Sequence, residues 1–263
     1  MGRLRRLALR ALHARTAKLP LAKCRRVAVV APHFDDEVLG CGGVIIDLVA
    51  RGVDVHLLYM TDGSKSHNHL LPEIARVRAE EARAVARHLQ VPTERVIMLD
   101  YEEGELASFV DEAVTRIGTY LQGHGIDTVF GPYGKGEHPD HSTTSEIVRR
   151  AIDGNAPSVD LYEYPVWAWH HWPWSPVPLP SRSDVVEIAR ASLIANIRIY
   201  RDVNLRLPLA AAARTAKRDT LELYRSQMTR LVDDPRWLTL EDVAGGGFLK
   251  NFVNSDEFFH RRR

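Results

Sequence analysis

Cysteine is scarce in this chain, and three absences limit what the protein can be. Its 263 residues include only Cys24 and Cys41 and no CxxC pair, which excludes a dense disulfide framework and favours a reducing, cytoplasmic location. No run of about 18 apolar residues occurs, so no transmembrane helix is expected. Charge of one sign is not in excess: 35 Lys and Arg stand against 34 Asp and Glu, a net charge of +1, which argues against a whole-chain nucleic-acid binder.

The composition that remains is typical of a folded globular protein, with 45% hydrophobic and 26% charged residues. The length suits one large α/β domain. We expect residues 1–263 to form a single domain with a basic N-terminal helix at 1–20, a core at 25–158 and a C-terminal elaboration at 159–263.

The N-terminal segment predicts a basic amphipathic helix. Its apolar residues follow helical spacing, and its basic residues are Arg3, Arg5, Arg6, Arg10, Arg15 and Lys18. The apolar stretch between them is too short for a signal-peptide core. Two interpretations stay open: a helix packed on the domain edge or frayed as a tail, and weak attraction to an anionic membrane surface.

Short β-rich apolar runs alternate with helical patterns four times before residue 158. The runs lie at 26–32, 53–61, 95–100 and 127–132, and the helical patterns end near 50, 90, 122 and 152. This alternation predicts βαβ units and therefore an α/β fold with a Rossmann-like, mainly parallel sheet flanked by helices.

The alternation stops after residue 158, where an irregular extension rich in Pro and Trp is expected. Residues 159–166 predict a strand, part of 185–203 a further β-like stretch, and 209–231 a long helix. The segment between them holds Trp167, Trp169, Trp172 and Trp174. These aromatics suit either a stacking wall for sugar rings or a second small core or subunit contact.

Two polar clusters follow the first and fourth predicted strands, at residues 33–37 and 138–141. Ligands in open parallel sheets bind beyond the carboxyl ends of the strands, where the strand order reverses. The common order 3-2-1-4 places that reversal between strands one and four. We therefore expect the two clusters to face each other across one crevice.

The clusters contain the ligand types of a catalytic zinc site. His33, Asp36 and His141 could supply three protein ligands and leave a fourth position for water. One zinc ion per chain is expected, although iron or another divalent ion also suits these donors. In the simpler interpretation, Asp35 and Asp36 complement a helix N-terminus and the two histidines of the second cluster form a capped turn.

Three further polar residues share the expected crevice. Asp35 could accept a proton from metal-bound water, and His138 could donate to a developing oxyanion. Asp140 could fix the tautomer of a histidine.

The two clusters resemble the signatures of a known family. Residues 31–37 (APHFDDE) are similar to the AHPDDE signature, and residues 138–141 are identical to the HPDH signature, of the LmbE-like or PIG-L zinc-dependent N-deacetylases. Weaker similarities lie at 61–63, 78–82, 101–106 and 217–227, so the resemblance covers about residues 25–230. Phe34 replaces the usual Pro, and Glu103 replaces an Asp.

The resemblance implies residue roles for a deacetylase. His33, Asp36 and His141 are the implied metal ligands, Asp35 the general base, His138 the acid or electrostatic partner of the tetrahedral intermediate, and Asp140 the residue that tunes it. Arg78 and Asp62 are implied substrate contacts, to which we add Tyr133, Trp167 and Trp169 as candidates.

The predicted function is removal of an N-acetyl or similar N-acyl group from an amino sugar or N-acetylglucosamine conjugate. The expected partner is that small molecule, without nucleic acid; a homo-oligomer is an open alternative. Two other functions remain as alternatives: a non-catalytic carbohydrate-binding protein on a deacetylase fold, and a nucleotide-sugar-handling Rossmann protein. The glycines at residues 40–43 suggest the second only weakly, because they do not form the turn between the first strand and its helix.

Overall fold

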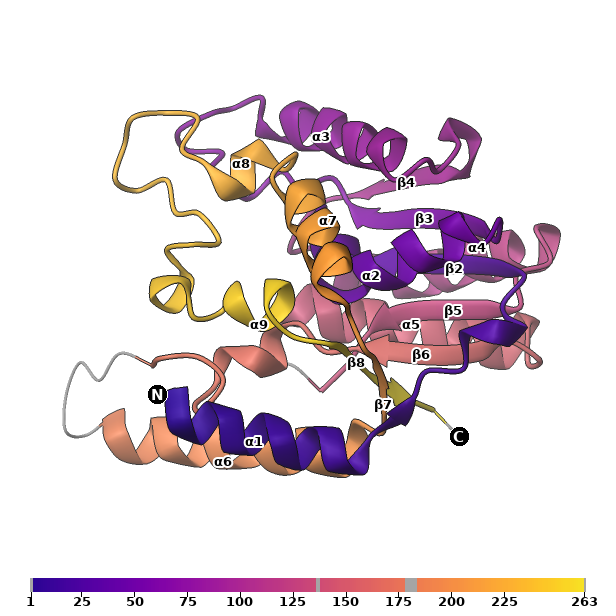
Figure 1. Cartoon of the computed structure of the whole chain (residues 1–263). Coiled ribbons are helices and arrows are strands. Elements are labelled where there is room, and N and C mark those ends of the chain that lie inside the picture. Colours follow the sequence, from indigo (N-terminus) through magenta and orange to yellow (C-terminus); the bar gives the residue numbers. More distant parts are fainter. Residues whose placement is uncertain (1, 136–137, 178–183, 263) are drawn as a thin grey trace.

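A mainly parallel sheet forms the centre of the computed structural model, which describes residues 2–135, 138–177 and 184–262 (Figure 1). Within these residues the sheet has eight strands in the order β1-β7-β8-β6-β5-β2-β3-β4. Neighbouring strands pair in parallel except at β8, which runs antiparallel to β6 and β7. The strands are β1 (Ala17–Lys18), β2 (Arg26–Ala31), β3 (Asp54–Thr61), β4 (Val96–Tyr101), β5 (Thr128–Pro132), β6 (Asp160–Tyr164), β7 (Leu205–Leu207) and β8 (Glu257–Arg261).

Helices follow the central strands in the predicted alternation. After β2, β3, β4 and β5 come α2 (Asp36–Ala50), α3 (Ile74–His88), α4 (Val110–Gly123) and α5 (Pro139–Asn155). The α/β fold is thus confirmed, and the order β4-β3-β2-β5 is the expected 3-2-1-4. The order reverses between β2 and β5, so the loops that leave their carboxyl ends lie side by side.

The sheet is covered on both faces because its side chains alternate between two cores. Along β2, Val27, Val29 and Ala31 belong to the core that includes residues of α2 and α3. Ala28 and Val30 belong to the opposite core, which includes residues of α4 and α5. Apolar residues on both faces are what a buried parallel strand requires.

The C-terminal third differs from expectation in two places. The β-like stretch predicted within 185–203 is wrong, because Asp184–Asp202 forms the helix α6. Its β-branched residues favour a strand, but its buried residues Ser192 and Ile199 are seven positions apart, which is the spacing of one helix face. The single helix predicted at 209–231 is instead α7 (Ala211–Leu221) and the short α8 (Arg225–Met228). A further short helix, α9 (Lys250–Val253), precedes β8.

The predicted basic N-terminal helix is present as α1 (Gly2–Arg15) and lies along α6 (Figure 1). Leu12 is fully buried, the Tyr200 hydroxyl of α6 donates to the Ala8 carbonyl at 2.9 Å, and Leu4 and Leu7 remain more than half exposed. None of the helices in the described part of the chain is long and apolar enough to span a membrane.

Candidate active site

The first polar cluster forms the turn between β2 and α2. Asp35 precedes the helix with a φ of 111°, a left-handed conformation that costs about 1–3 kcal/mol for a residue other than glycine. Its N–H donates to the buried Glu37 carboxylate at 3.2 Å, and the Tyr224 hydroxyl donates to the same carboxylate at 2.5 Å. Glu37 therefore supports the strained turn from inside and ties it to the C-terminal third of the chain.

The second cluster begins α5. His138 is the residue before the helix, Pro139 occupies its first turn, and Asp140 and His141 follow in that turn. Proline suits this position because it has no N–H to satisfy there. The backbone thus directs the side chains of the first turn toward the neighbouring β2–α2 turn.

The two clusters meet, as the topology predicted. The Asp36 Oδ2 atom lies 3.2 Å from His33 Nδ1 and 3.0 Å from His141 Nε2. On its other side, His33 Nε2 lies 3.1 Å from Asp140 Oδ2, which also accepts the Gly104 N–H at 2.9 Å. His33 thus directs Nδ1 toward Asp36 and His141, while Asp140 holds its Nε2. A histidine that binds a metal through one ring nitrogen is commonly held by a carboxylate at the other.

The donor set fits a divalent metal ion of the zinc class. Two imidazoles and one carboxylate converge from His33, Asp36 and His141, all of which are buried. A second grouping also exists: ring nitrogens of His33, His138 and His141 all lie within 4.8 Å of one another. The two sets share two histidines, so the roles of Asp36 and His138 distinguish them.

The two adjacent aspartates have opposite pKa shifts. Burial and the Asp36 charge raise the pKa of Asp35 well above its usual range, and Arg78 offsets this only in part. Burial also opposes ionisation of Asp36, but the charges and hydrogen bonds of His141 and His33 hold its pKa well below the usual range. Environments that give neighbouring carboxyl groups very different pKa values are typical of sites where one group acts as an acid or base and the other stays ionised.

The pKa values of His33 and His138 are also shifted in opposite directions. Burial lowers the pKa of His33, but its hydrogen bonds to Asp140 and Asp36 outweigh burial and raise the pKa to about 10. Burial, and then the charges of His33 and His141, lower the pKa of His138 to about 4. His138 is therefore a neutral imidazole at pH 7, and its buried Nδ1 has no hydrogen-bond partner within the described part of the chain.

A cavity of about 280 Å³ opens over these residues. Arg78 lines it as expected; the side chain is buried, donates to the Phe34 carbonyl at 2.8 Å and lies 3.7 Å from the Glu103 carboxylate. Trp167 lines the cavity too, and its indole N–H donates to His141 Nε2 at 3.2 Å. The Trp167 ring also stacks on His138 with ring centroids 5.5 Å apart.

The other three predicted substrate contacts lie elsewhere. The Asp62 carboxylate accepts the N–H groups of Ser64 and Glu103, so it orders the loop after β3. The Tyr133 hydroxyl donates to Asp202 at 2.6 Å and faces a different cavity. Trp169 is 5% exposed and packs edge-to-face on Trp174, which is a core position.

Several cavity residues come from the C-terminal third and have no motif in the sequence. They are Gln227, Leu238, Thr239, Leu240, Val243 and Phe248. The loop after β3 is anchored to this region, because His67 stacks on Trp237 at 4.2 Å and its Nε2 donates to the Leu238 carbonyl. Only tertiary packing brings these residues to the carboxyl end of the sheet, beside His33 and His138.

A family comparison covers the segment that holds both clusters. Residues 28–152 match the model described as "PIG-L: GlcNAc-PI de-N-acetylase". Through this segment the chain is similar to the PIG-L (LmbE-like) family. The PIG-L match contains His33, Asp36 and His141 as well as Arg78, whereas α6 and the later elements lie outside it.

The chain is also similar to individual proteins. The chain is 33% identical over 131 residues to diacetylchitobiose deacetylase of Thermococcus kodakarensis, covering 46% of this chain and 47% of that protein, so it spans about half of the relative's length. In structure it is similar to a zinc-inhibited form of teicoplanin deacetylase, with 17% identity, 90% and 97% coverage and a TM-score of 0.60. It is also similar to 4-carboxy-2-hydroxymuconate hydratase of Pseudomonas putida, with 17% identity, 91% and 96% coverage and a TM-score of 0.52. At these identities the two structures share the fold, and the hydratase shows that the fold alone does not specify the reaction.

Proposed function

We propose that this protein is a metal-dependent hydrolase that removes an N-acetyl or similar N-acyl group from an amino sugar or an N-acetylglucosamine-containing conjugate. The observation that carries the proposal is the meeting of His33, Asp36 and His141 next to a cavity that Asp35 and His138 also line. The PIG-L match and the deacetylase relative support this chemical class.

His33, Asp36 and His141 would hold one divalent ion, for which we propose zinc. When bound, such an ion lowers the pKa of a coordinated water molecule and polarises the amide carbonyl. Asp140 keeps His33 oriented by accepting from its Nε2. We further propose one domain, with the divisions set out above, and a cytoplasmic location, for which the support is that Cys24 and Cys41 are buried and free.

Asp35 would accept the proton of the attacking water. Its pKa is raised by burial, so it holds the proton more firmly than an ordinary carboxylate and can pass it on to the leaving amine. His138, a neutral imidazole at pH 7, would offer one N–H to the oxyanion, a contact worth about 3–4 kcal/mol when well aligned. Arg78 would position the β2–α2 turn through the Phe34 carbonyl.

An amine-release assay tests this function. Wild-type protein loaded with zinc is expected to release a primary amine from at least one member of a panel of N-acetylated amino sugars and their conjugates. His141→Ala is expected to lose both turnover and bound metal, since one of three ligands is removed; elemental analysis measures the metal. Full zinc occupancy in His141→Ala would contradict the ligand assignment. If zinc-loaded wild-type protein released no amine from any sugar in the panel, the proposed substrate class would be rejected.

The nucleotide-sugar alternative loses the support of the glycines at residues 40–43. Gly40, Gly42 and Gly43 lie inside α2 and not in a phosphate-binding turn. A Cβ at Gly40 would come within 2.2 Å of the Tyr164 ring, and one at Gly43 within 2.4 Å of Leu209. These glycines let α2 pack closely, which needs no ligand. A non-catalytic sugar binder would bind the same panel without releasing amine.

Weak membrane contact through α1 remains a proposal. Leu4 and Leu7 are exposed on a helix that contains arginines and no acid. If this face adsorbs to anionic lipid, the protein sediments with phosphatidylserine-containing vesicles at low salt and not with neutral ones, and deletion of residues 2–15 abolishes the effect. Equal recovery with both vesicle types would contradict it.

A further inference from the structure

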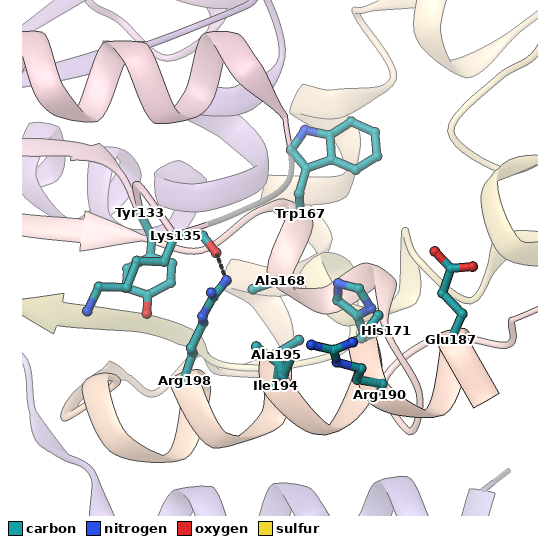
Figure 2. Close-up of a pocket in the computed structure, with 11 residues that line it drawn as sticks. Tyr133, Lys135, Trp167, Ala168, His171, Glu187, Arg190, Ile194, Ala195 and Arg198 are labelled. Atoms are coloured by element: carbon teal, nitrogen blue, oxygen red, sulfur yellow. Dashed lines mark hydrogen bonds between the residues drawn. The ribbon is translucent and has the colours of Figure 1, made fainter. Parts of the chain in front are cut away.

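A second cavity shares Trp167 with the cavity at the metal-binding residues, and Figure 2 shows the side chains that line this second cavity. It measures about 340 Å³, and Trp167 lines both cavities. One wall is the face of α6 that carries Ala191 and Ala195, whose small side chains leave the space open. The other wall comes from the segment of Trp167 and from the turn after β5, which leads directly to His138. The two cavities therefore adjoin at Trp167.

The charges around the second cavity are mostly positive. Among the described residues that line it, Lys135, Arg190 and Arg198 are basic and Glu187 is the one acid. Lys135 is already paired, since its Nζ lies 2.8 Å from Asp202, which Arg201 also binds. The free positive charge therefore belongs to the two arginines of α6.

Neither arginine has an acidic partner in the part of the chain that the structure describes. Arg198 donates to the Lys135 carbonyl at 3.2 Å, a neutral acceptor, and Figure 2 shows its guanidinium reaching across the cavity toward that turn. Arg190 projects toward the cavity beside His171 in the same view. Guanidinium groups bind carboxylates and phosphates in preference to neutral groups.

We propose that this second cavity binds an anionic group, a phosphate or a carboxylate, carried by the substrate at a distance from the amide that is hydrolysed. The proposal rests on the proposed function, because the amide must lie at His33, Asp36 and His141. It assigns Arg190 and Arg198 to recognition of the anion and Trp167 to the passage between the two cavities. The preferred substrate is then an acidic conjugate of an N-acylated amino sugar.

Selectivity for acidic substrates tests the proposal. The measured quantity is the ratio of kcat/KM for an acidic sugar to that for neutral N-acetylglucosamine. N-acetylglucosamine 1-phosphate and 6-phosphate form the phosphate arm, and N-acetylmuramic acid forms the carboxylate arm. We expect a ratio of about ten or more in at least one arm, since a hydrogen bond to a charged group is worth about that factor. The ratio should fall as salt is added, because exposed charges are screened.

The double variant R190Q/R198Q should bring the ratio close to one. The matched control is R87Q, which removes an exposed arginine from α3, at the opposite end of the molecule in Figure 1, and should keep the wild-type ratio. A wild-type ratio near one in all arms, or a ratio that survives in R190Q/R198Q, overturns the proposal.

Calorimetric titration separates this proposal from the proposed reaction. If no sugar is hydrolysed but the phosphorylated sugars bind wild-type protein and R190Q/R198Q weakens that binding about tenfold, the anion site stands and the deacetylase function falls. If sugars are hydrolysed without acidic preference, the function stands and the anion site falls. If the phosphorylated sugars neither bind nor react, the anion site falls as well.

Discussion

Asp35→Asn is expected to lower kcat for amine release by roughly 10²–10⁴-fold while zinc content stays at the wild-type level. The amide has the size of the carboxylate but cannot accept the water proton. Asparagine also tolerates positive φ better than most residues, so the turn at φ 111° is retained. The readouts are steady-state kinetics and metal analysis on the same preparation.

The pH dependence of the wild-type enzyme follows from the same residue. Burial raises the pKa of Asp35, and only the ionised form accepts a proton, so kcat should rise as pH increases through that raised pKa. Asp47→Asn is the matched control, because Asp47 is exposed on the same helix and its ion pair within the described residues is with Arg51. If Asp35→Asn kept the wild-type kcat, Asp35 would not be the residue that accepts the water proton.

Lys217→Met is expected to destabilise the fold by about 3–5 kcal/mol, the usual cost of leaving a buried charge without its partner. Lys217 is fully buried in α7, and its Nζ donates to the Leu39 carbonyl at 2.8 Å and to Glu257 at 2.7 Å. Glu257 in turn accepts the N–H groups of Gly43 and Val44 at 2.7 and 3.0 Å. The pair therefore joins α7 and β8 to the helix that begins at Asp36. Urea unfolding followed by circular dichroism measures the loss.

Two variants isolate the cause of that loss. Lys23→Met removes an exposed lysine and should change the free energy of unfolding by less than about 0.5 kcal/mol. Lys217→Met combined with Glu257→Gln should be less destabilised than Lys217→Met alone, because no unpaired charge remains. The double variant could instead lose as much free energy of unfolding as Lys217→Met and Glu257→Gln lose when their separate effects are added. That result would show that lost packing, and not an unpaired charge, is responsible.

The central fold and the meeting of the two clusters could be predicted because both depend on local patterns and one topological rule. Alternating strands and helices imply parallel neighbours, and the 3-2-1-4 order then brings His33 and His141 to one edge of the sheet. The rings of these residues, more than 100 positions apart in the sequence, lie 5.3 Å apart in the structure.

The rest of the site could not be predicted because it depends on long-range packing. The β-branched residues of α6 favour a strand, and only the contacts with α1 and the Trp segment show why a helix forms there. Trp167 and Trp169 are two residues apart and look equivalent in the sequence, yet Trp167 lines both cavities and Trp169 is buried on Trp174. The neighbours of each ring decide its role, and those neighbours are distant in the sequence: His138 and His141 for Trp167, and Phe258 for Trp169.

The most direct test of the account is an anomalous difference map recorded at the zinc absorption edge from crystals of the zinc-loaded protein. We predict one peak within about 2.0–2.2 Å of His33 Nδ1, an Asp36 carboxylate oxygen and His141 Nε2, with His138 outside the coordination sphere. A peak held by His138 in place of Asp36, or the absence of any peak between these residues, would contradict it.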